Sequence, residues 1–299
     1  MEFKDLEIFQ MVAEKGTITE AAKELRYVQS NITSRIQKLE NELKTPLFNR
    51  HHRGMILTPE GKRLLVYSEK ILSLTNEMRK VVQNDKEPSG KLEIGSVETV
   101  INLPIILSRY NKKYKQVDLS LFTGVTEQLQ YKVLHHQLDG AFISEGATHS
   151  DLAIHEVLEE ELVLLSDKPF QSIEDIKDEP ILCFSKGCGY RARLELWLED
   201  EKLKPTKMME FGTLETILGS VAAGLGVTFV PKSTVAHLVE QELVYCYHLP
   251  PKYSRIKTVF VRRSDSYLTP TIQKFIEVIE EFHQETLDQF QNSTQSLRP

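Results

Sequence analysis

The stretch from Thr19 to Glu40 constrains the fold most, because its apolar residues indicate two short helices joined by a tight turn. On the second helix, apolar residues follow one another at steps of four, four and three, which is the spacing of one helix face. These residues are Val28, Ile32, Ile36 and Leu39. The opposite face carries hydroxyl and amide side chains, which can hydrogen-bond base edges. The pattern therefore predicts a helix-turn-helix whose second helix enters a major groove.

The residues expected to contact DNA lie on this second helix and just beyond it. On the helix they are Gln29, Ser30, Asn31, Thr33, Ser34, Arg35 and Gln37. After the helix, two short apolar runs flank a basic tip, which predicts a two-stranded wing. Arg50 and Arg53 at that tip are placed to reach phosphates or a minor groove. A solvated basic loop is the alternative interpretation of this segment.

The distribution of charge is compatible with DNA binding although the chain as a whole is acidic. The formal net charge is −6. Residues 1–65 hold eleven Lys and Arg against nine Asp and Glu, so this segment carries +2 and the remainder carries −8. Contacts to phosphates depend on local charge, so a small positive segment on an acidic body remains compatible with a nucleic-acid partner.

A long helix is predicted after the wing, beginning at Thr58 and Pro59, a helix cap followed by a proline suited to the first turn. Its apolar residues alternate at three- and four-residue steps, as in a heptad seam. They are Leu64, Tyr67, Ile71, Leu74, Met78 and Val81. Such a seam favours a dimerisation helix, with packing on its own domain as the alternative. A polar hinge containing Pro88 and Gly90 follows.

Beyond the hinge, strand and helix patterns alternate, which implies parallel sheets with helices on both faces. The amount of sequence fits two small α/β lobes. The expected fold is therefore α/β, preceded by a mainly α winged helix-turn-helix and a linker helix. The domains are expected at residues 1–58, 59–87 and 88–299. Within the last, we expect lobe I at about 91–161 and 267–299, and lobe II at about 162–266.

Several function classes are excluded by what the sequence lacks. It has no basic and apolar export signal at its start, and its longest nearly apolar run, 217–230, is too short to span a bilayer. Three cysteines do not suggest a disulfide scaffold, so a cytoplasmic location is expected. There is no nucleophile elbow, no phosphate-binding P-loop and no H-E-x-x-H zinc motif. We therefore expect no enzyme, no metal site and no cofactor.

From Ala21 to Gly61 the sequence resembles the LysR-type transcriptional regulators, and the resemblance extends over nearly the whole chain. The matching positions are Ala21, Ala22, Leu25, Thr33, Ile36, Leu39, Glu40, Leu43, Leu47, Phe48, Arg50, Leu57, Thr58 and Gly61. Two positions depart from the family pattern. Val28 stands where the family often has a Ser or Thr cap, and Thr33-Ser34 replaces a common Ser-Arg pair. The missing arginine means that no operator preference can be transferred from the family.

The resemblance implies a two-lobed effector domain similar to periplasmic binding proteins, in a homodimer or a dimer of dimers. The implied partners are a double-stranded DNA operator and a small effector, with RNA polymerase as a further candidate. The effector site implied between the lobes comprises Ser96, Glu98, Thr99, Thr123, Ser144, Ser185, Lys186, Gly187, Cys188 and Val227. Hydroxyls and helix-start amides there suit an anionic or amphoteric metabolite. Glu98 fits an anion poorly, so either it points away or the ligand carries an amine.

Two other functions remain open at this stage. Cys188 lies between glycines near Lys186 and Arg191, which could lower its pKa, and it could form a redox pair with Cys183. Cys183 itself lies within an apolar strand pattern, which argues against such a pair. A solute-binding protein for transport would share the two lobes, but it would need an export signal and would not use the segment from Thr19 to Glu40.

Overall fold

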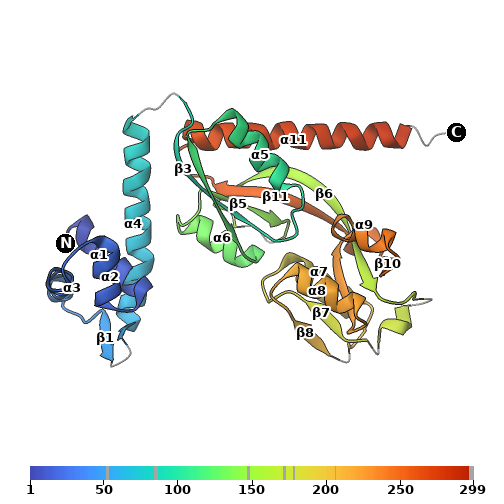
Figure 1. Ribbon diagram of the computed structural model, residues 1–299, viewed down its shortest axis with the longest axis horizontal. Helices are drawn as coiled ribbons and strands as arrows, with labels where there is room; N and C mark the ends of the chain where they lie inside the picture. The colour runs from blue at the N-terminus through green and yellow to red at the C-terminus, as the bar shows by residue number, and fades with distance from the viewer. Residues whose placement is uncertain are drawn as a thin grey trace. The chain divides into compact units, whose positions relative to one another are not determined.

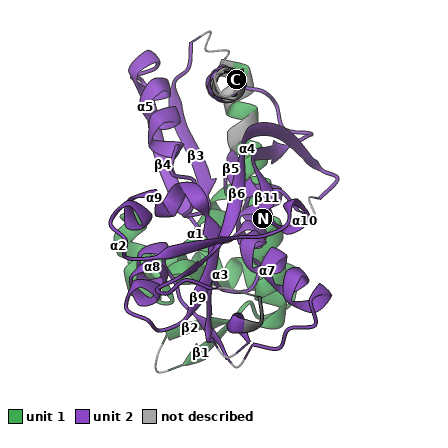
Figure 2. Cartoon of the chain, turned by 90° about the vertical axis from the view of Figure 1, so that its right-hand side faces the viewer, with its two compact units in different colours: residues 1–84, 135–137 green, residues 85–134, 138–299 purple. Residues whose placement is uncertain are grey.

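The computed structural model describes residues 1–51, 54–83, 87–146, 149–170, 173–177, 179–205 and 207–295. The chain divides into two compact units (Figure 2). Unit 1 contains residues 1–84 with 135–137, and unit 2 contains residues 85–134 with 138–299. In the described residues, no helix combines the length and apolar character needed to cross a membrane.

Unit 1 begins with three helices around one apolar core, and the last two are the pair that the sequence predicts. The three helices are α1 (Phe3–Lys15), α2 (Ile18–Leu25) and α3 (Gln29–Leu43). Ile32, Ile36 and Leu39 of α3 are buried in this core. The expectation that Val28 belongs to the same apolar face is wrong. Val28 caps the start of α3 with an extended backbone, outside the helical repeat, and its side chain is 69% exposed.

The turns between these helices follow from local chemistry. Gly16 ends α1 at a φ of 69°, a left-handed conformation that glycine adopts without strain. Thr17 then caps α2, because its hydroxyl accepts a hydrogen bond from the Glu20 N–H at 3.2 Å. Arg26 ends α2 in the left-handed region, at a φ of 55°, and α3 begins three residues later. The result is the tight connection that a helix-turn-helix requires.

The predicted wing is confirmed by two antiparallel strands, β1 (Phe48–His51) and β2 (Gly54–Leu57). Glu40 of α3 holds the base of the wing, since its Oε1 accepts hydrogen bonds from the N–H groups of Leu47 at 2.8 Å and Phe48 at 3.2 Å. The N–H of Met55 in β2 also donates to the carbonyl of Gly16. The wing is therefore anchored to both α3 and the end of α1.

The long helix after the wing, α4 (Pro59–Gln83), begins where the sequence predicts. The Thr58 hydroxyl caps it by accepting a hydrogen bond from the Gly61 N–H at 2.9 Å. Gly61 is required for close approach, because a Cβ there would lie 2.2 Å from the carbonyl oxygen of Leu47. The start of α4 and the base of the wing thus pack backbone against backbone.

Unit 2 has two apolar cores, and we call the parts around them lobe I and lobe II. The first elements of lobe I alternate as predicted. They are β3 (Gly90–Ser96), α5 (Leu103–Lys113), β4 (Val117–Thr123), α6 (Thr126–Leu134) and β5 (Gly140–Ser144). The chain returns to this lobe at its end with α11 (Pro270–Gln295), which packs against α5 (Figure 1).

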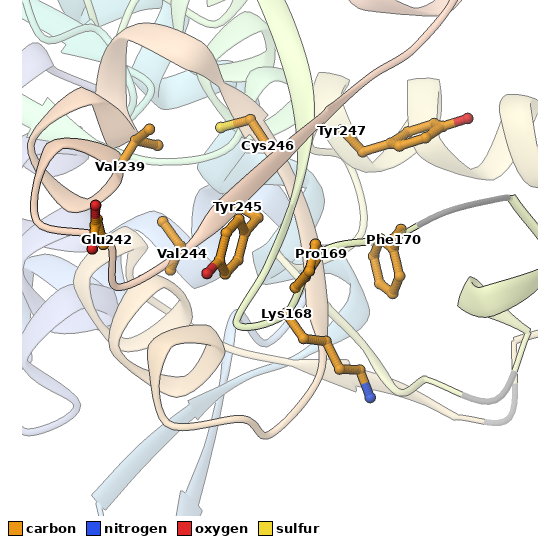
Figure 3. Close-up of a pocket in the computed structure, with 9 residues that line it drawn as sticks. All are labelled: Lys168, Pro169, Phe170, Val239, Glu242, Val244, Tyr245, Cys246 and Tyr247. Atoms are coloured by element: carbon orange, nitrogen blue, oxygen red, sulfur yellow. The ribbon is translucent and has the colours of Figure 1, made fainter.

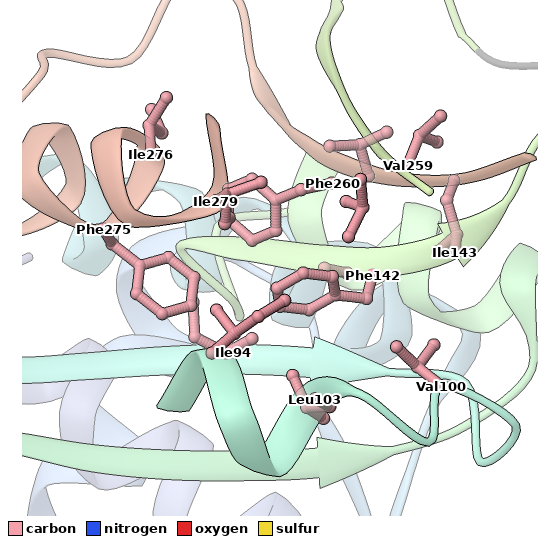
Figure 4. Close-up of a cluster of buried hydrophobic side chains, with 14 of the residues drawn as sticks. Ile94, Val100, Leu103, Phe142, Ile143, Val259, Phe260, Phe275, Ile276 and Ile279 are labelled. Atoms are coloured by element: carbon pink, nitrogen blue, oxygen red, sulfur yellow. The ribbon is translucent and has the colours of Figure 1, made fainter. Parts of the chain in front are cut away.

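Aromatic rings from three elements pack together within the mostly aliphatic core of lobe I. Phe142 lies on β5, Phe260 on β11 (Arg255–Arg263) and Phe275 on α11, and their ring centroids are 5.0 to 6.1 Å apart (Figure 4). These separations are typical of favourable edge-to-face contacts. Because α11 supplies one of these rings, the last helix is part of the lobe and closes its core.

Apart from two long strands that run through both lobes, lobe II contains the remaining elements of the chain. They are η1 (Ile173–Ile176), β7 (Ile181–Cys183), α7 (Gly189–Asp200), β8 (Met208–Glu210), α8 (Leu214–Ala222), β9 (Val227–Pro231), α9 (Lys232–Glu240), β10 (Tyr245–His248) and α10 (Pro251–Ser254). The alternation of strand and helix patterns does not predict η1, α9, β10 or α10.

The expectation of parallel sheets is confirmed for part of each lobe and wrong for the sheet as a whole, which is mixed. Its strand order is β4-β3-β5-β11-β6-β9-β7-β8, and β10 pairs with β6. Strand β3 pairs in parallel with β4 and β5, and β7 pairs in parallel with β8 and β9, whereas the pairs that involve β6, β10 or β11 are antiparallel. The two long strands β6 (Leu152–Ser166) and β11 (Arg255–Arg263) run antiparallel to each other and continue from one lobe into the other. The expected lobe boundary near residue 266 is also wrong, since Val259 and Phe260 lie in the core of lobe I while Ile256 lies in that of lobe II.

Candidate functional site

The polar face of α3 has the exposure that DNA contact requires. Most of the side chains expected to read bases are exposed on this helix: Gln29, Ser30, Asn31, Ser34 and Gln37. Thr33 is half-buried, and its hydroxyl donates a hydrogen bond to the carbonyl of Gln29 at 2.9 Å. Thr33 is therefore partly committed to the helix itself, whereas the other five have side chains open to solvent.

Arg35 differs from its neighbours because it is bound to α1. Its guanidinium lies 2.7 Å from the carboxylate of Asp5, which is buried, and 3.0 Å from that of Glu2. Lys38, which sequence reasoning did not select, lies 2.8 Å from Glu2, and its hydrogen bond is the main cause that lowers the pKa of Glu2 to about 2. The geometry thus gives Arg35 a structural partner in α1.

The wing presents one described cation of the two that the sequence predicts. Arg50 lies on β1 with its side chain exposed. Arg53 lies outside the described residues. An exposed guanidinium on the wing is suited to a phosphate contact, because its N–H groups can donate paired hydrogen bonds to phosphate oxygens.

The seam predicted on α4 is largely open to solvent in the single chain. Tyr67, Leu74 and Met78 are 64%, 51% and 58% exposed. Leu64 instead packs against the core of the helix-turn-helix, and Ile71 is half-buried. Val81 lies on α4, but its side chain is outside the described part of the structure. Large apolar side chains that stay exposed along one helix are typical of a surface that binds another protein chain.

In unit 2, a cavity of about 190 Å³, which we call cavity A, lies where loops of lobe I and lobe II meet. Its lining residues are Val97, Glu98, Thr99, Thr123, Gly124, Val125, Gln128, Ser144, Phe184, Ser185, Cys188, Tyr190 and Gly212. Six of the ten residues expected at the effector site are among them. Ser96 and Val227 are not, because both are buried within strands and Ser96 hydrogen-bonds the backbone of Val97.

A second and more open cavity of about 710 Å³, cavity B, lies between α6, the end of β5 and α7. Lys186 and Gly187, which were expected beside the other effector residues, line cavity B, as does Arg191. Ser144 and Cys188 line both cavities and therefore lie between them. The structure thus places the cationic residues of this region on cavity B, which Thr99, Thr123 and Ser185 do not line.

Direct hydrogen bonds join the two lobes around cavity A. The Thr99 hydroxyl donates to the Tyr190 hydroxyl at 2.7 Å, and both side chains are buried. Glu98 Oε2 accepts a hydrogen bond from the Leu214 N–H, at the start of α8, at 2.9 Å. Burial raises the pKa of Tyr190, so this phenol remains a neutral hydrogen-bonding group at physiological pH.

Sequence reasoning missed several residues of cavity A, Tyr190 and Gln128 among them. Tyr190 begins a helical stretch with an apolar pattern, so it resembles an ordinary core residue. Only its pairing with Thr99, which is 91 positions away in the chain, indicates a place at the cavity wall. Gln128 lies on α6 without any local motif.

The two cysteines considered for redox sensing are not activated. Burial raises the pKa of the Cys188 thiol and also that of Cys183, which contradicts the expectation that Lys186 and Arg191 lower the former. Lys186 is exposed on cavity B, and the guanidinium of Arg191 is bonded to Glu195, Glu210 and the carbonyl of Phe184. A protonated thiol is a poor nucleophile toward oxidants, so the redox interpretation is disfavoured.

Lobe II also has a surface pocket of about 490 Å³, away from both cavities (Figure 3). It is lined by the loop after β6, the end of α9 and strand β10, with Phe170, Tyr245 and Tyr247 among its residues. Lys168 at its edge forms an ion pair with Glu179. Among the described residues, no group of three or more His, Cys, Asp or Glu could hold a metal ion.

Comparison with known proteins identifies both halves of the chain. The model described as "Bacterial regulatory helix-turn-helix protein, lysR family" matches residues 3–62, and that described as "LysR substrate binding domain" matches residues 85–284. The HTH-type transcriptional regulator SoxR of Arthrobacter sp. (strain TE1826) is 56% identical over 279 residues, covering 93% of this chain and 96% of that protein. The HTH-type transcriptional regulator CzcR of Bacillus cereus is 54% identical over 283 residues, covering 95% of this chain and 98% of that protein.

Solved structures agree on the fold. A full-length OxyR variant from Pseudomonas aeruginosa has a TM-score of 0.69 at 22% identity, covering 94% of each chain. Full-length CbnR, solved in complex with its target DNA, has a TM-score of 0.68 at 21% identity, covering 94% of this chain and 100% of that one. The curated relatives above are transcriptional regulators and not enzymes. This chain belongs to the LysR family and is a DNA-binding transcriptional regulator with an effector-binding domain.

Proposed function

We propose that the exposed polar face of α3 reads base edges in the major groove, while Arg50 on the wing holds the phosphate backbone. The support is the set of five exposed hydroxyl and amide side chains on one helix, beside a wing anchored by Glu40. Arg35 is omitted from the base-reading set because it is paired with Asp5. The polar face needs no net positive charge, since its contacts are to bases.

We propose that α4 forms the dimer through its exposed seam, so that two recognition helices meet a site with two-fold related halves. The relevant support is the exposure of Tyr67, Leu74 and Met78 on one chain. The same proposal includes a further pairing of such dimers and a contact with RNA polymerase. It also includes a cytoplasmic location, because a regulator of transcription acts where the operator lies.

We propose that a small polar metabolite binds in cavity A and thereby changes the arrangement of the lobes. A cavity whose walls come from both lobes is suited to this role, because a ligand held there shifts the equilibrium between lobe arrangements by its difference in affinity for them. Of the anionic and amphoteric classes expected from the sequence, the amphoteric class suits the lining of cavity A better, because Glu98 is the only charged residue among the lining residues that the structure describes.

A thermal-shift screen of metabolites on the full chain tests this assignment. A ligand at a hundredfold excess over its Kd should stabilise the domain by about 2.7 kcal/mol. Thr99→Val and Ser144→Ala should each abolish that shift, whereas Ser150→Ala, an exposed serine outside the cavity, should leave it intact. A shift that survives both cavity substitutions would place the ligand elsewhere.

A further inference from the structure

The charge on the wall of cavity A is opposite to what an anionic effector requires. Among the described residues that line it, Glu98 alone is charged and none is cationic. Lys186, the cation expected there from the sequence, lines cavity B instead, as does Arg191. Arg191 is in addition held by two carboxylates and a carbonyl. Within the described part of the chain, no side chain of cavity A could therefore neutralise a ligand carboxylate.

Glu98 is held in place by the opposite lobe. Its Oε2 accepts a hydrogen bond from the N–H of Leu214 at 2.9 Å, and the start of α8 favours a negative charge at this position. The other oxygen, Oε1, accepts no hydrogen bond from the part of the chain that the structure describes. The wall of cavity A thus carries a carboxylate positioned by the opposite lobe, with one oxygen still available as an acceptor.

The other polar groups around the cavity are neutral. Thr123, Gln128 and Ser185 provide hydroxyl and amide groups that can bind an oxygen or a nitrogen of a ligand. A protonated amine would gain a charge-assisted hydrogen bond from Glu98, whereas a second carboxylate would be repelled by it. The lining is thus complementary to a ligand with a cationic nitrogen and polar neutral or carboxylate groups at the other end.

We propose that Glu98 is the specificity-determining residue of cavity A, selecting small ligands that carry a protonated amine and rejecting dicarboxylates of the same size. This inference rests on the proposed role of cavity A as the effector site. Two unit charges a few ångströms apart near a protein surface interact strongly enough to change an affinity by about tenfold or more. The expected selectivity is of that order.

Three probes with the same four-carbon skeleton test the proposal on the full chain: succinate, 4-aminobutanoate and 1,4-diaminobutane. Their affinities are measured by isothermal titration calorimetry at equal ionic strength. We expect the two amines to bind about tenfold or more tightly than succinate. In Glu98→Gln the amide oxygen can still accept from the Leu214 N–H while the charge is lost, so the preference should fall to about twofold or less.

Glu93→Gln serves as the matched control, since Glu93 is a carboxylate of β3 that pairs with Lys91 outside the cavity. It should leave the amine preference unchanged. Equal binding of succinate and the amines, no binding of either amine, or an amine preference that persists in Glu98→Gln would overturn the proposal. If amine binding also survives Thr99→Val and Ser144→Ala, then the assignment of cavity A as the effector site fails as well. If those two substitutions abolish binding and Glu98→Gln has no effect, only the role of Glu98 fails.

Discussion

Replacement of Arg35 by methionine distinguishes a structural role for this residue from a role in DNA contact. The guanidinium lies 2.7 Å from Asp5, whose carboxylate is buried and also accepts the N–H of Glu2 at 2.9 Å in the cap of α1. Breaking a buried ion pair by removing one partner costs about 3–5 kcal/mol. Because the Arg35 side chain is 32% exposed, water can partly replace it, and we expect a loss of about 2–3 kcal/mol.

Hydrogen exchange measured by mass spectrometry on α1 gives this loss directly within unit 1. A loss of about 2–3 kcal/mol corresponds to exchange that is faster by about 30- to 150-fold. The matched variant carries Asp5→Asn together with Arg35→Met, which removes both charges. It should recover most of the protection and most of the affinity for DNA. If Arg35→Met keeps full protection of α1 but loses DNA binding, and the double variant does not restore it, Arg35 is a DNA contact and the structural account is wrong.

Three further predictions concern other parts of the chain. Leu74→Asp places a charge in the exposed seam of α4, so sedimentation velocity should show smaller species than for the unmodified protein. The control Lys62→Asp, on the same helix, should keep the oligomer. An unchanged oligomer in Leu74→Asp would contradict the proposed dimer helix. Gly61→Ala should lower the free energy of unfolding of unit 1 by about 1–3 kcal/mol, because the added Cβ would lie 2.2 Å from a backbone oxygen. An unchanged unfolding transition in calorimetry would refute this prediction. Since burial raises the pKa of Cys188, its thiol should stay protonated near pH 7 and should be alkylated faster only as the pH rises. After peroxide treatment, mass spectrometry should find no disulfide between Cys188 and Cys183. Detection of that disulfide would support redox sensing.

Local periodicity was sufficient to predict the elements of unit 1. The apolar steps that define α3 and α4, the cap at Thr58, and the paired apolar runs of the wing all act within a few residues of one another. The sequence alone did not predict which polar side chains pair with distant residues in the folded chain. The pairing of Arg35 with Asp5 joins positions 30 apart, and no local pattern distinguishes it from an arginine that faces DNA.

The sheet and the cavity were predicted less completely, for a related reason. Alternating strands and helices suggested parallel pairing, but β6 and β11 lie far apart in the chain and pair antiparallel, which only the folded chain reveals. Ser144 and Lys186 were expected at one site, yet Lys186 lies on cavity B alone, because the loop before α7 separates the two cavities at Cys188. Strand ends were therefore predictable, while the direction in which each loop residue points was not.

The most direct test of DNA recognition compares Gln29→Ala with Arg50→Ala on an operator selected from randomised duplexes by the unmodified protein. Fluorescence anisotropy is measured on the selected and on a scrambled duplex over a range of salt concentrations. We predict that Gln29→Ala loses about 1–3 kcal/mol of discrimination at one base pair of each half-site, whereas Arg50→Ala weakens both duplexes equally and lowers the salt slope by about 1. If the two substitutions reduce binding alike on both duplexes, or if neither changes it, α3 and the wing do not divide base reading and phosphate contact in the way proposed.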